Sequence, residues 1–259
     1  MLWNFFISLS GNFFLCYFIR EKVLKSFTDM AEQTKTITTK YRSEVIESLI
    51  TVFTTRYFYI GFFSVLAGIA LNIASQTYLH NYMSEGVTLP MLSDLILDNL
   101  PVIDLSLVYD IICLIPIFLM FIYIVHKKEY NRIPFILLMV GIFYLVRGVF
   151  IVLTPFGNPP MFGGSDPLFN GFSKYELGVY PSGHAGNVFM LFLLVNDSVY
   201  KKIIIICLTI VIIALFLSHG HYSIDIFSGI FFSYAIRAYG EKHFPNFVLS
   251  NNKSDSSQS

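Results

Sequence analysis

Residues 203–218, "IIIICLTIVIIALFLS", decide the fold, because they contain no charged side chain over most of the thickness of a bilayer. A transmembrane helix needs about 20 mostly apolar residues, and residues 106–125 and 133–146 are almost as free of charge. Of the 259 residues, 55% are hydrophobic and only 13% are charged, whereas a soluble domain has about 25% charged residues. The sequence therefore predicts a polytopic membrane protein.

The expected fold is all-α, a bundle of six membrane-spanning helices, because a helix satisfies its own backbone hydrogen bonds in lipid. The apolar stretches place these spans at 57–78, 106–126, 133–153, 183–199, 203–219 and 222–239. Residues 2–19 are also apolar and long enough to cross, so they form either a seventh span or a helix lying in the membrane interface.

The spans divide the chain into three parts. Residues 1–56 are an apolar segment followed by an amphipathic cytoplasmic linker, residues 57–240 form the six-span domain, and residues 241–259 form a cytoplasmic tail whose polar end predicts disorder. The connection 79–105 is too apolar for a solvated loop and is expected along the membrane interface. The connection 154–182 is rich in proline and glycine, and loops of that length are often functional.

The cations give the expected orientation, because cytoplasmic loops carry an excess of Lys and Arg. With six spans, 15 of the 17 Lys and Arg fall on one side, which is then the cytoplasm. They are Arg20, Lys22, Lys25, Lys35, Lys40, Arg42, Arg56, Lys127, Lys128, Arg132, Lys201, Lys202, Arg237, Lys242 and Lys253. The net charge of zero gives no basic surface for nucleic acid, and the three cysteines form no disulfide framework or metal-binding pair.

The polar segment "HGHYSID", residues 219–225, stands where two expected spans meet on the non-cytoplasmic side. His221 and Asp225 are four residues apart and share one face of a helix. A carboxylate that accepts from one imidazole nitrogen fixes the tautomer and leaves the other nitrogen to attack. Tyr222 is a candidate substrate contact or an interface anchor, and His219 is expected to face the interface or the loop.

Three further groups are expected at the same depth. His184 follows the turn of Ser182 and Gly183, where helix-start N–H groups can cradle a phosphate oxygen. Arg147 lies near the outer end of its span, and a cation there needs a partner. Together these residues indicate phosphoryl transfer: His221 attacks phosphorus, His184 acts as acid and base, and Arg147 with the turn N–H groups stabilises the phosphoryl oxygens.

Other interpretations use the same residues. The polar groups can be structural, with Arg147 paired to Asp110 or Asp104. A metal site of His184, His219, His221 and Asp225 would be sensitive to chelators. A non-catalytic scaffold or transporter would keep its function when His221 is replaced. The phosphohistidine interpretation needs neither a metal nor another cofactor.

The segments "YPSGHAG" and "HYSID" resemble the second and third motifs of the type 2 phosphatidic acid phosphatase (PAP2) superfamily, and "HGHYSID" is closest to its sphingomyelin synthase branch. Residues 147–160, "RGVFIVLTPFGNPP", and "NLPVID" are similar to the first two motifs of that branch. The resemblance covers about residues 95–240. It implies a six-span fold with an outward-facing site, His221 as nucleophile, Asp225 as its partner and His184 as acid and base.

The chain departs from the phosphatases of that superfamily. No lysine precedes Arg147 at the phosphatase spacing, and no arginine shortly precedes His221. A phosphodiester carries one negative charge and a phosphomonoester nearly two, so a site with one arginine suits a phospholipid head group. The implied function is transfer of a phospho-head group from a phospholipid donor to a lipid acceptor such as ceramide or diacylglycerol. The alternative is a lipid phosphatase or phospholipase C-like hydrolase, which is compatible with the phosphatase-like proline of "PSGH".

Overall fold

The computed structural model describes residues 22, 25, 29–30, 32–35, 42–159 and 180–249. The expectations for residues 2–19, for the last nine residues and for most of the loop at 154–182 fall outside the described residues. The chain divides into two units, residues 1–50 and 51–259. In the first unit the described residues are helical, and the second unit contains every candidate site residue.

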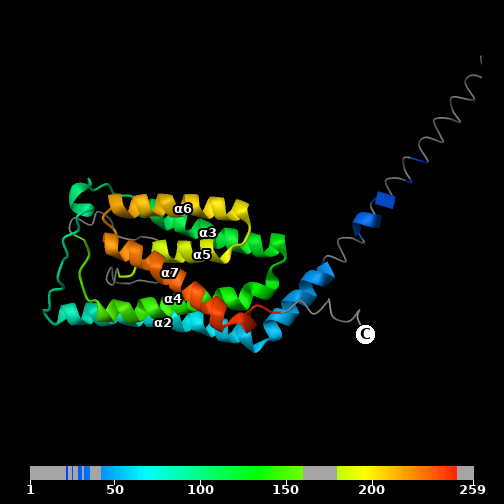
Figure 1. The fold of residues 1–259 in the computed structure, drawn as a ribbon, viewed down its shortest axis with the longest axis horizontal. Coiled ribbons are helices and arrows are strands. Elements are labelled where there is room, and N and C mark those ends of the chain that lie inside the picture. Colours follow the sequence, from blue (N-terminus) through cyan, green and yellow to red (C-terminus); the bar gives the residue numbers. More distant parts are fainter. Residues whose placement is uncertain are drawn as a thin grey trace, which may run out of the picture. The chain divides into compact units, whose positions relative to one another are not determined.

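The described part of the second unit is helical and contains no strand, which confirms the expected all-α class. Figure 1 shows its six long helices and their connections. They are α2 (Arg56–Ser84), α3 (Ser106–Lys127), α4 (Ile133–Leu153), α5 (Gly183–Leu194), α6 (Ser198–Leu217) and α7 (Ser223–His243), with short 3₁₀ turns η1 (Leu97–Asn99), η2 (Tyr130–Arg132) and η3 (Pro245–Phe247).

Four helices of the described part are long and apolar enough to cross a membrane: α2, α3, the stretch Tyr130–Leu153 that contains α4, and α6. The chain is therefore a membrane protein. The helices α5 and α7, where two more spans were expected, are not among these four.

The helix expected over 183–199 is two pieces in the structure. α5 has 12 residues, about 18 Å at 1.5 Å per residue, which is shorter than the hydrocarbon core of about 30 Å. α6 then starts anew, because the side chain of Asp197 accepts hydrogen bonds from Val199 N at 2.9 Å and Tyr200 N at 3.3 Å. Aspartate is a preferred N-cap residue, so this carboxylate favours a new helix start over continuation of α5.

The helices pack in two groups that meet at α4, α5 and α7. α2 packs along α4, and α3 packs along α6, while α5 contacts α3, α6 and α7 (Figure 1). The α2–α4 contact depends on glycines. A Cβ at position 68 would lie 2.7 Å from Tyr144 Cβ, and one at position 141 would lie 2.7 Å from the backbone of Ser64. Small residues of this kind let the backbones of membrane helices approach closely.

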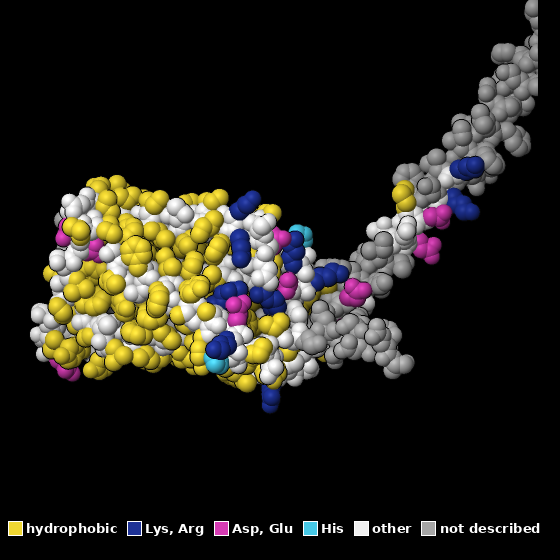
Figure 2. Space-filling view, viewed as in Figure 1, with side chains coloured by type: hydrophobic (Ala, Val, Ile, Leu, Met, Phe, Trp, Pro, Cys, Tyr) yellow, Lys and Arg dark blue, Asp and Glu magenta, His cyan; other side chains and the backbone are white. Residues whose placement is uncertain are grey.

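Charged side chains lie at the two ends of the bundle, and the surface between the ends is mostly hydrophobic (Figure 2). Lys and Arg gather at the end where α3 leads into α4 and α5 into α6, and Lys127 makes an ion pair with Asp197 there at 2.7 Å. The opposite end holds the connection between α2 and α3, the start of α5 and the turn between α6 and α7 (Figure 1). Every candidate side chain except that of Arg147, on α4, comes from the start of α5 or α7 or from the turns before them.

Candidate functional site

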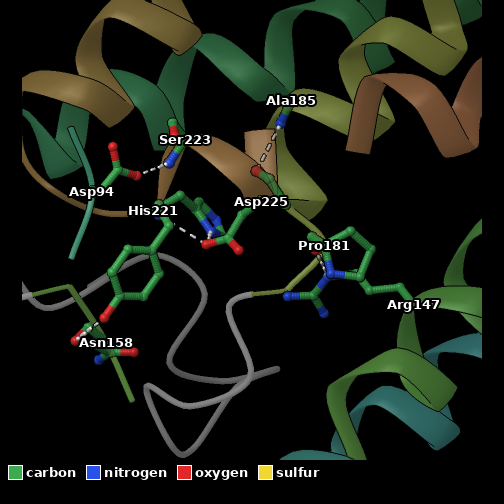
Figure 3. A network of polar contacts seen from close by, with 10 residues as sticks. Asp94, Arg147, Asn158, Pro181, Ala185, His221, Ser223 and Asp225 are labelled. Atoms are coloured by element: carbon green, nitrogen blue, oxygen red, sulfur yellow. Dashed lines mark hydrogen bonds and ion pairs between the residues drawn. The ribbon is translucent and has the colours of Figure 1, made fainter. Parts of the chain in front are cut away.

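His221 and Asp225 form the pair that their spacing predicts. His221 lies in the turn between α6 and α7, and its Nδ1 is 3.4 Å from Asp225 Oδ2 (Figure 3). Both residues are buried, Asp225 completely. Burial lowers the pKa of His221 below its usual value, and the hydrogen bond and charge of Asp225 oppose that shift. A neutral imidazole engaged at Nδ1 has Nε2 as its nucleophilic nitrogen.

The carboxylate of Asp225 also shapes the turn that carries His221. Its Oδ2 accepts a hydrogen bond from Tyr222 N at 2.8 Å, in the manner of a helix-capping carboxylate. Asp225 is the third residue of α7, so the negative charge lies near the positive end of the helix dipole. The side chain of Asp225 therefore orients the imidazole of His221 and also holds the backbone of the next residue, Tyr222.

A second histidine–aspartate pair lies beside the first. His184, in the first turn of α5, has its Nε2 3.2 Å from Asp110 Oδ1 on α3. Asp110 is fully buried. From the sequence, Asp110 is expected only as a partner of Arg147, and its pairing with His184 is not predicted. A lone carboxylate in an apolar span, four residues after the start of α3, was the available signal.

The two pairs meet because α5 and α7 touch through glycines. A Cβ at position 229 would lie 2.6 Å from the carbonyl oxygen of Ser182, and one at position 186 would lie 3.0 Å from Gly229 O. The backbone N–H of Ser182 donates to Asp225 O at 2.9 Å. As a result, the rings of His184 and His221 lie with their centroids 5.9 Å apart.

Arg147, on α4, extends its side chain toward the turn that precedes His184 (Figure 3). Its Nε donates to the carbonyl oxygen of Pro181 at 3.0 Å, and its Nη1 donates to Asn72 Oδ1. A Cβ at position 183 would lie 3.2 Å from Arg147 Nε, so the glycine makes room for the guanidinium. Arg147 interacts electrostatically with both Asp225 and His221.

Asn72 on α2 is a site residue that the sequence analysis missed. It is buried, its Nδ2 donates to Gly68 O at 2.7 Å and Tyr144 O at 2.6 Å, and its oxygen faces Arg147. A polar side chain in the middle of an apolar span was the signal for it.

Ser182 and Tyr222, two predicted substrate contacts, make hydrogen bonds within the protein. Ser182 Oγ accepts from Ala185 N at 3.3 Å and so caps α5. Tyr222 is 1% exposed, so its side chain does not anchor the protein in the membrane interface. Its hydroxyl donates to Asn158 O at 3.1 Å and accepts from Leu92 N at 3.1 Å. Both residues therefore support the site rather than line an open face of it.

Asp94, in the connection between α2 and α3, is the third residue that the sequence analysis missed. Its Oδ2 accepts from Ser223 N at 2.6 Å, at the start of α7 (Figure 3). Burial raises the pKa of this carboxyl, but hydrogen bonds from Ser223, Leu97 and Ile96 outweigh that effect and hold the pKa below its usual value.

His219 is buried, 3% exposed, with a φ of 50°. It therefore does not face the membrane interface. Within the described residues, no group of three or more His, Cys, Asp or Glu side chains is placed to hold a metal ion.

The described fold and site define a helical membrane protein in which two adjacent histidine–aspartate pairs and one arginine converge at one end of the bundle. No protein-family model matches the sequence, and no curated protein matches it significantly.

Proposed function

We propose that the protein is an integral-membrane lipid phosphotransferase. It moves a phospho-head group from a glycerophospholipid to a lipid alcohol such as ceramide or diacylglycerol, through a phosphohistidine on His221. The observation that carries the proposal is the adjacency of the two pairs, His221 with Asp225 and His184 with Asp110, whose imidazole rings are 5.9 Å apart. Two histidines with separate carboxylates suit one nucleophile and one proton carrier.

In the first step, Nε2 of His221 attacks the phosphorus of the donor. A P–N bond forms and the bond between phosphorus and the glyceride oxygen breaks. Protonated His184 gives its proton to the departing oxygen, which leaves as diacylglycerol. Asp225 keeps the proton on Nδ1 of His221 and stabilises the positive charge that develops on the ring.

In the second step, the hydroxyl of the acceptor lipid gives its proton to His184 and attacks the same phosphorus. The P–N bond breaks, and its electron pair returns to Nε2 of His221. Asp110 stabilises the protonated form of His184 before the first step and again after the second, because the carboxylate lies 3.2 Å from Nε2. His184 ends the cycle protonated, as it began.

Among the described residues, Arg147 is the one Lys or Arg side chain of the proposed site. Its contacts with Pro181 O and Asn72 fix the guanidinium next to the start of α5. Preorganised donors of this kind stabilise the charge that develops on the phosphoryl oxygens. One cation balances the single charge of a phosphodiester, which favours a phospholipid over a phosphomonoester donor.

The sequence pattern supports a more detailed topology as part of this proposal: six spans, or seven if residues 2–19 also cross, and a site on the non-cytoplasmic side. The gathering of Lys and Arg at the end of the bundle away from His221 agrees with the positive-inside rule (Figure 2). The short α5 and the polar α7 would cross within the bundle, covered by their neighbours.

The test uses purified full-length protein in lipid nanodiscs with fluorescent ceramide, fluorescent diacylglycerol, phosphatidylcholine and phosphatidylethanolamine. We expect a new phosphorylated lipid on thin-layer chromatography, unaffected by a chelator and lost in His221→Ala. His126→Ala is the matched control, because His126 lies at the far end of α3 and contacts Tyr200. It should retain full activity.

The acceptor is the part of the proposal that this assay decides. Release of soluble phosphocholine or phosphoethanolamine without a new lipid would establish the hydrolase alternative, with water in place of the lipid alcohol. If no variant differs from wild type and neither product forms, phosphatidic acid is the remaining substrate to test. Inactivity there would refute the enzyme proposal.

A further inference from the structure

Residues 90–103, here called the strap, cross the end of the bundle that carries His221. They connect α2 to α3, and their backbone is held at four points. Gly157 N donates to Pro90 O at 3.0 Å, Leu92 N donates to the Tyr222 hydroxyl at 3.1 Å, and Ile103 N donates to Leu217 O at 2.7 Å. The fourth point is Asp94, which accepts from Ser223 N at 2.6 Å. The strap is thus a fixed part of the site end.

The strap exposes large apolar side chains, whereas a solvated loop exposes mainly polar ones. Its inward side contains the buried Asp94 and Leu97. Its outward side exposes large apolar side chains, with Leu95 84% and Met91 67% exposed. Smaller exposed fractions are found for Leu92, Ile96, Val102 and Ile103. In water, such a surface would be costly, because each apolar side chain favours burial by about 1.5–3 kcal/mol.

The position of the strap indicates what covers that surface. It lies within the connection from Ser84 to Ser106, which are the ends of two helices long and apolar enough to cross a membrane. The ends of membrane-crossing helices lie near the boundary between hydrocarbon and head groups, which would put the strap at that level. The polar Asp98 and Asn99 are exposed on it as well, as in segments that lie in the membrane interface.

We propose that the strap is a lipid-binding surface that buries Met91 and Leu95 in the leaflet on the site side of the membrane. The occupant is the boundary between acyl chains and head groups. At the ends of α2 and α3 next to the strap, Tyr82, Met83 and Leu107 are exposed as well. This inference does not depend on the proposed catalysis.

The surface also gives the strap a way to affect the site. Asp94 joins the lipid-facing segment directly to the first residue of α7, two positions after His221. Leu92 of the strap donates to the hydroxyl of Tyr222, the residue next to His221. Lipid contact on Leu95 therefore stabilises the backbone that positions His221.

The test places a single environment-sensitive fluorophore on the full-length chain in nanodiscs, after replacement of Cys16, Cys113 and Cys207. The label goes on Leu95→Cys or Met91→Cys. Asp98→Cys, on the same strap, is the water-facing control, and Phe118→Cys, exposed in the middle of α3, is the deep control. Quenchers are iodide in water and phospholipids with a spin label either near the head group or near the chain end.

At Leu95 and Met91 we expect strong quenching by the lipid labelled near its head group and weak quenching by iodide. Asp98 should show the opposite order, and Phe118 should respond most to the lipid labelled near its chain end. Strong iodide quenching at Leu95 without lipid quenching would overturn the proposal in favour of a solvated loop. Protection from all three quenchers would overturn it in favour of a protein cover.

Discussion

The backbone N–H of Ser182 donates to the carbonyl oxygen of Asp225 at 2.9 Å, which joins the "PSGH" turn to the start of α7. The residues are 43 positions apart, and the whole of α6 lies between them. This hydrogen bond holds the two turns that carry His184 and His221 against each other.

Asp225→Asn should lower turnover by about 10²- to 10⁴-fold, the range of a general acid–base contribution. An amide can donate to Nδ1 of His221 and so favour the tautomer whose Nε2 carries the proton and cannot attack. Transfer of the fluorescent head group measures the effect. Glu241→Gln, at the other end of α7, is the control and should be unchanged. Normal turnover in Asp225→Asn would remove Asp225 from the mechanism.

Asp110→Asn should slow the reaction because protonated His184 loses its counter-charge. The expected loss is about 10- to 100-fold in kcat, with a smaller change in KM for the donor lipid. Steady-state kinetics across a pH series provide the measurement. Asp104→Asn is a matched change, since among the described residues Asp104 accepts hydrogen bonds from the N–H and hydroxyl of Ser106 and lies outside the site. An equal loss in both variants would contradict a specific role for Asp110.

Asn72→Leu removes the oxygen that faces Arg147 while keeping a similar volume. We expect weaker donor binding and a loss of about 1–3 kcal/mol in the free energy of unfolding, because a buried charged group loses a hydrogen-bond partner. KM for the donor and the thermal midpoint report the two effects. Thr77→Leu on the same helix is the control, because the exposed Thr77 hydroxyl donates to Ile73 O in its own helix.

Gly229→Ala should destabilise the fold, because a Cβ there would lie 2.6 Å from Ser182 O. Overpacking of this kind costs about 1–3 kcal/mol and would separate His184 from His221. Gly157→Ala is the matched control, since its nearest neighbour would be at an ordinary 3.6 Å. Thermal unfolding in nanodiscs should show a lower midpoint for Gly229→Ala alone, accompanied by reduced activity.

The carboxylate of Asp94 gives a prediction for acid pH. Its folded pKa is depressed, so its stabilising contribution is present above the unfolded pKa of about 3.9 and is lost as the pH falls through the lower folded value. Asp94→Asn should therefore be less stable than wild type near neutral pH, and the difference should shrink on acidification below about pH 4. Thermal midpoints measured across that range provide the test. A difference that stays constant with pH would show that the charge of Asp94 does not matter.

The sequence predicted the features that depend on local composition. Apolar runs placed six helices, and the four-residue spacing of His221 and Asp225 predicted their pairing, although His221 lies in the turn before α7 and not on the helix itself. The partners of His184 and Arg147 were not predictable in this way. Asp110 and Asn72 lie more than 70 residues from the side chains that they contact, and no local pattern joins them. The early end of α5 was missed because the capping preference of Asp197 outweighed the apolar run before it.

The division of the helices into two groups has a mechanical consequence. The cation of the site is on α4, which packs along α2, whereas both histidine–aspartate pairs belong to α3, α5 and α7 and the turns before them. A small slide of the α2–α4 pair along its neighbours would withdraw the guanidinium of Arg147 and leave the imidazole geometry intact. In the proposed reaction, head-group binding by Arg147 and bond breaking by the histidines would then be adjusted separately, by different parts of the same bundle.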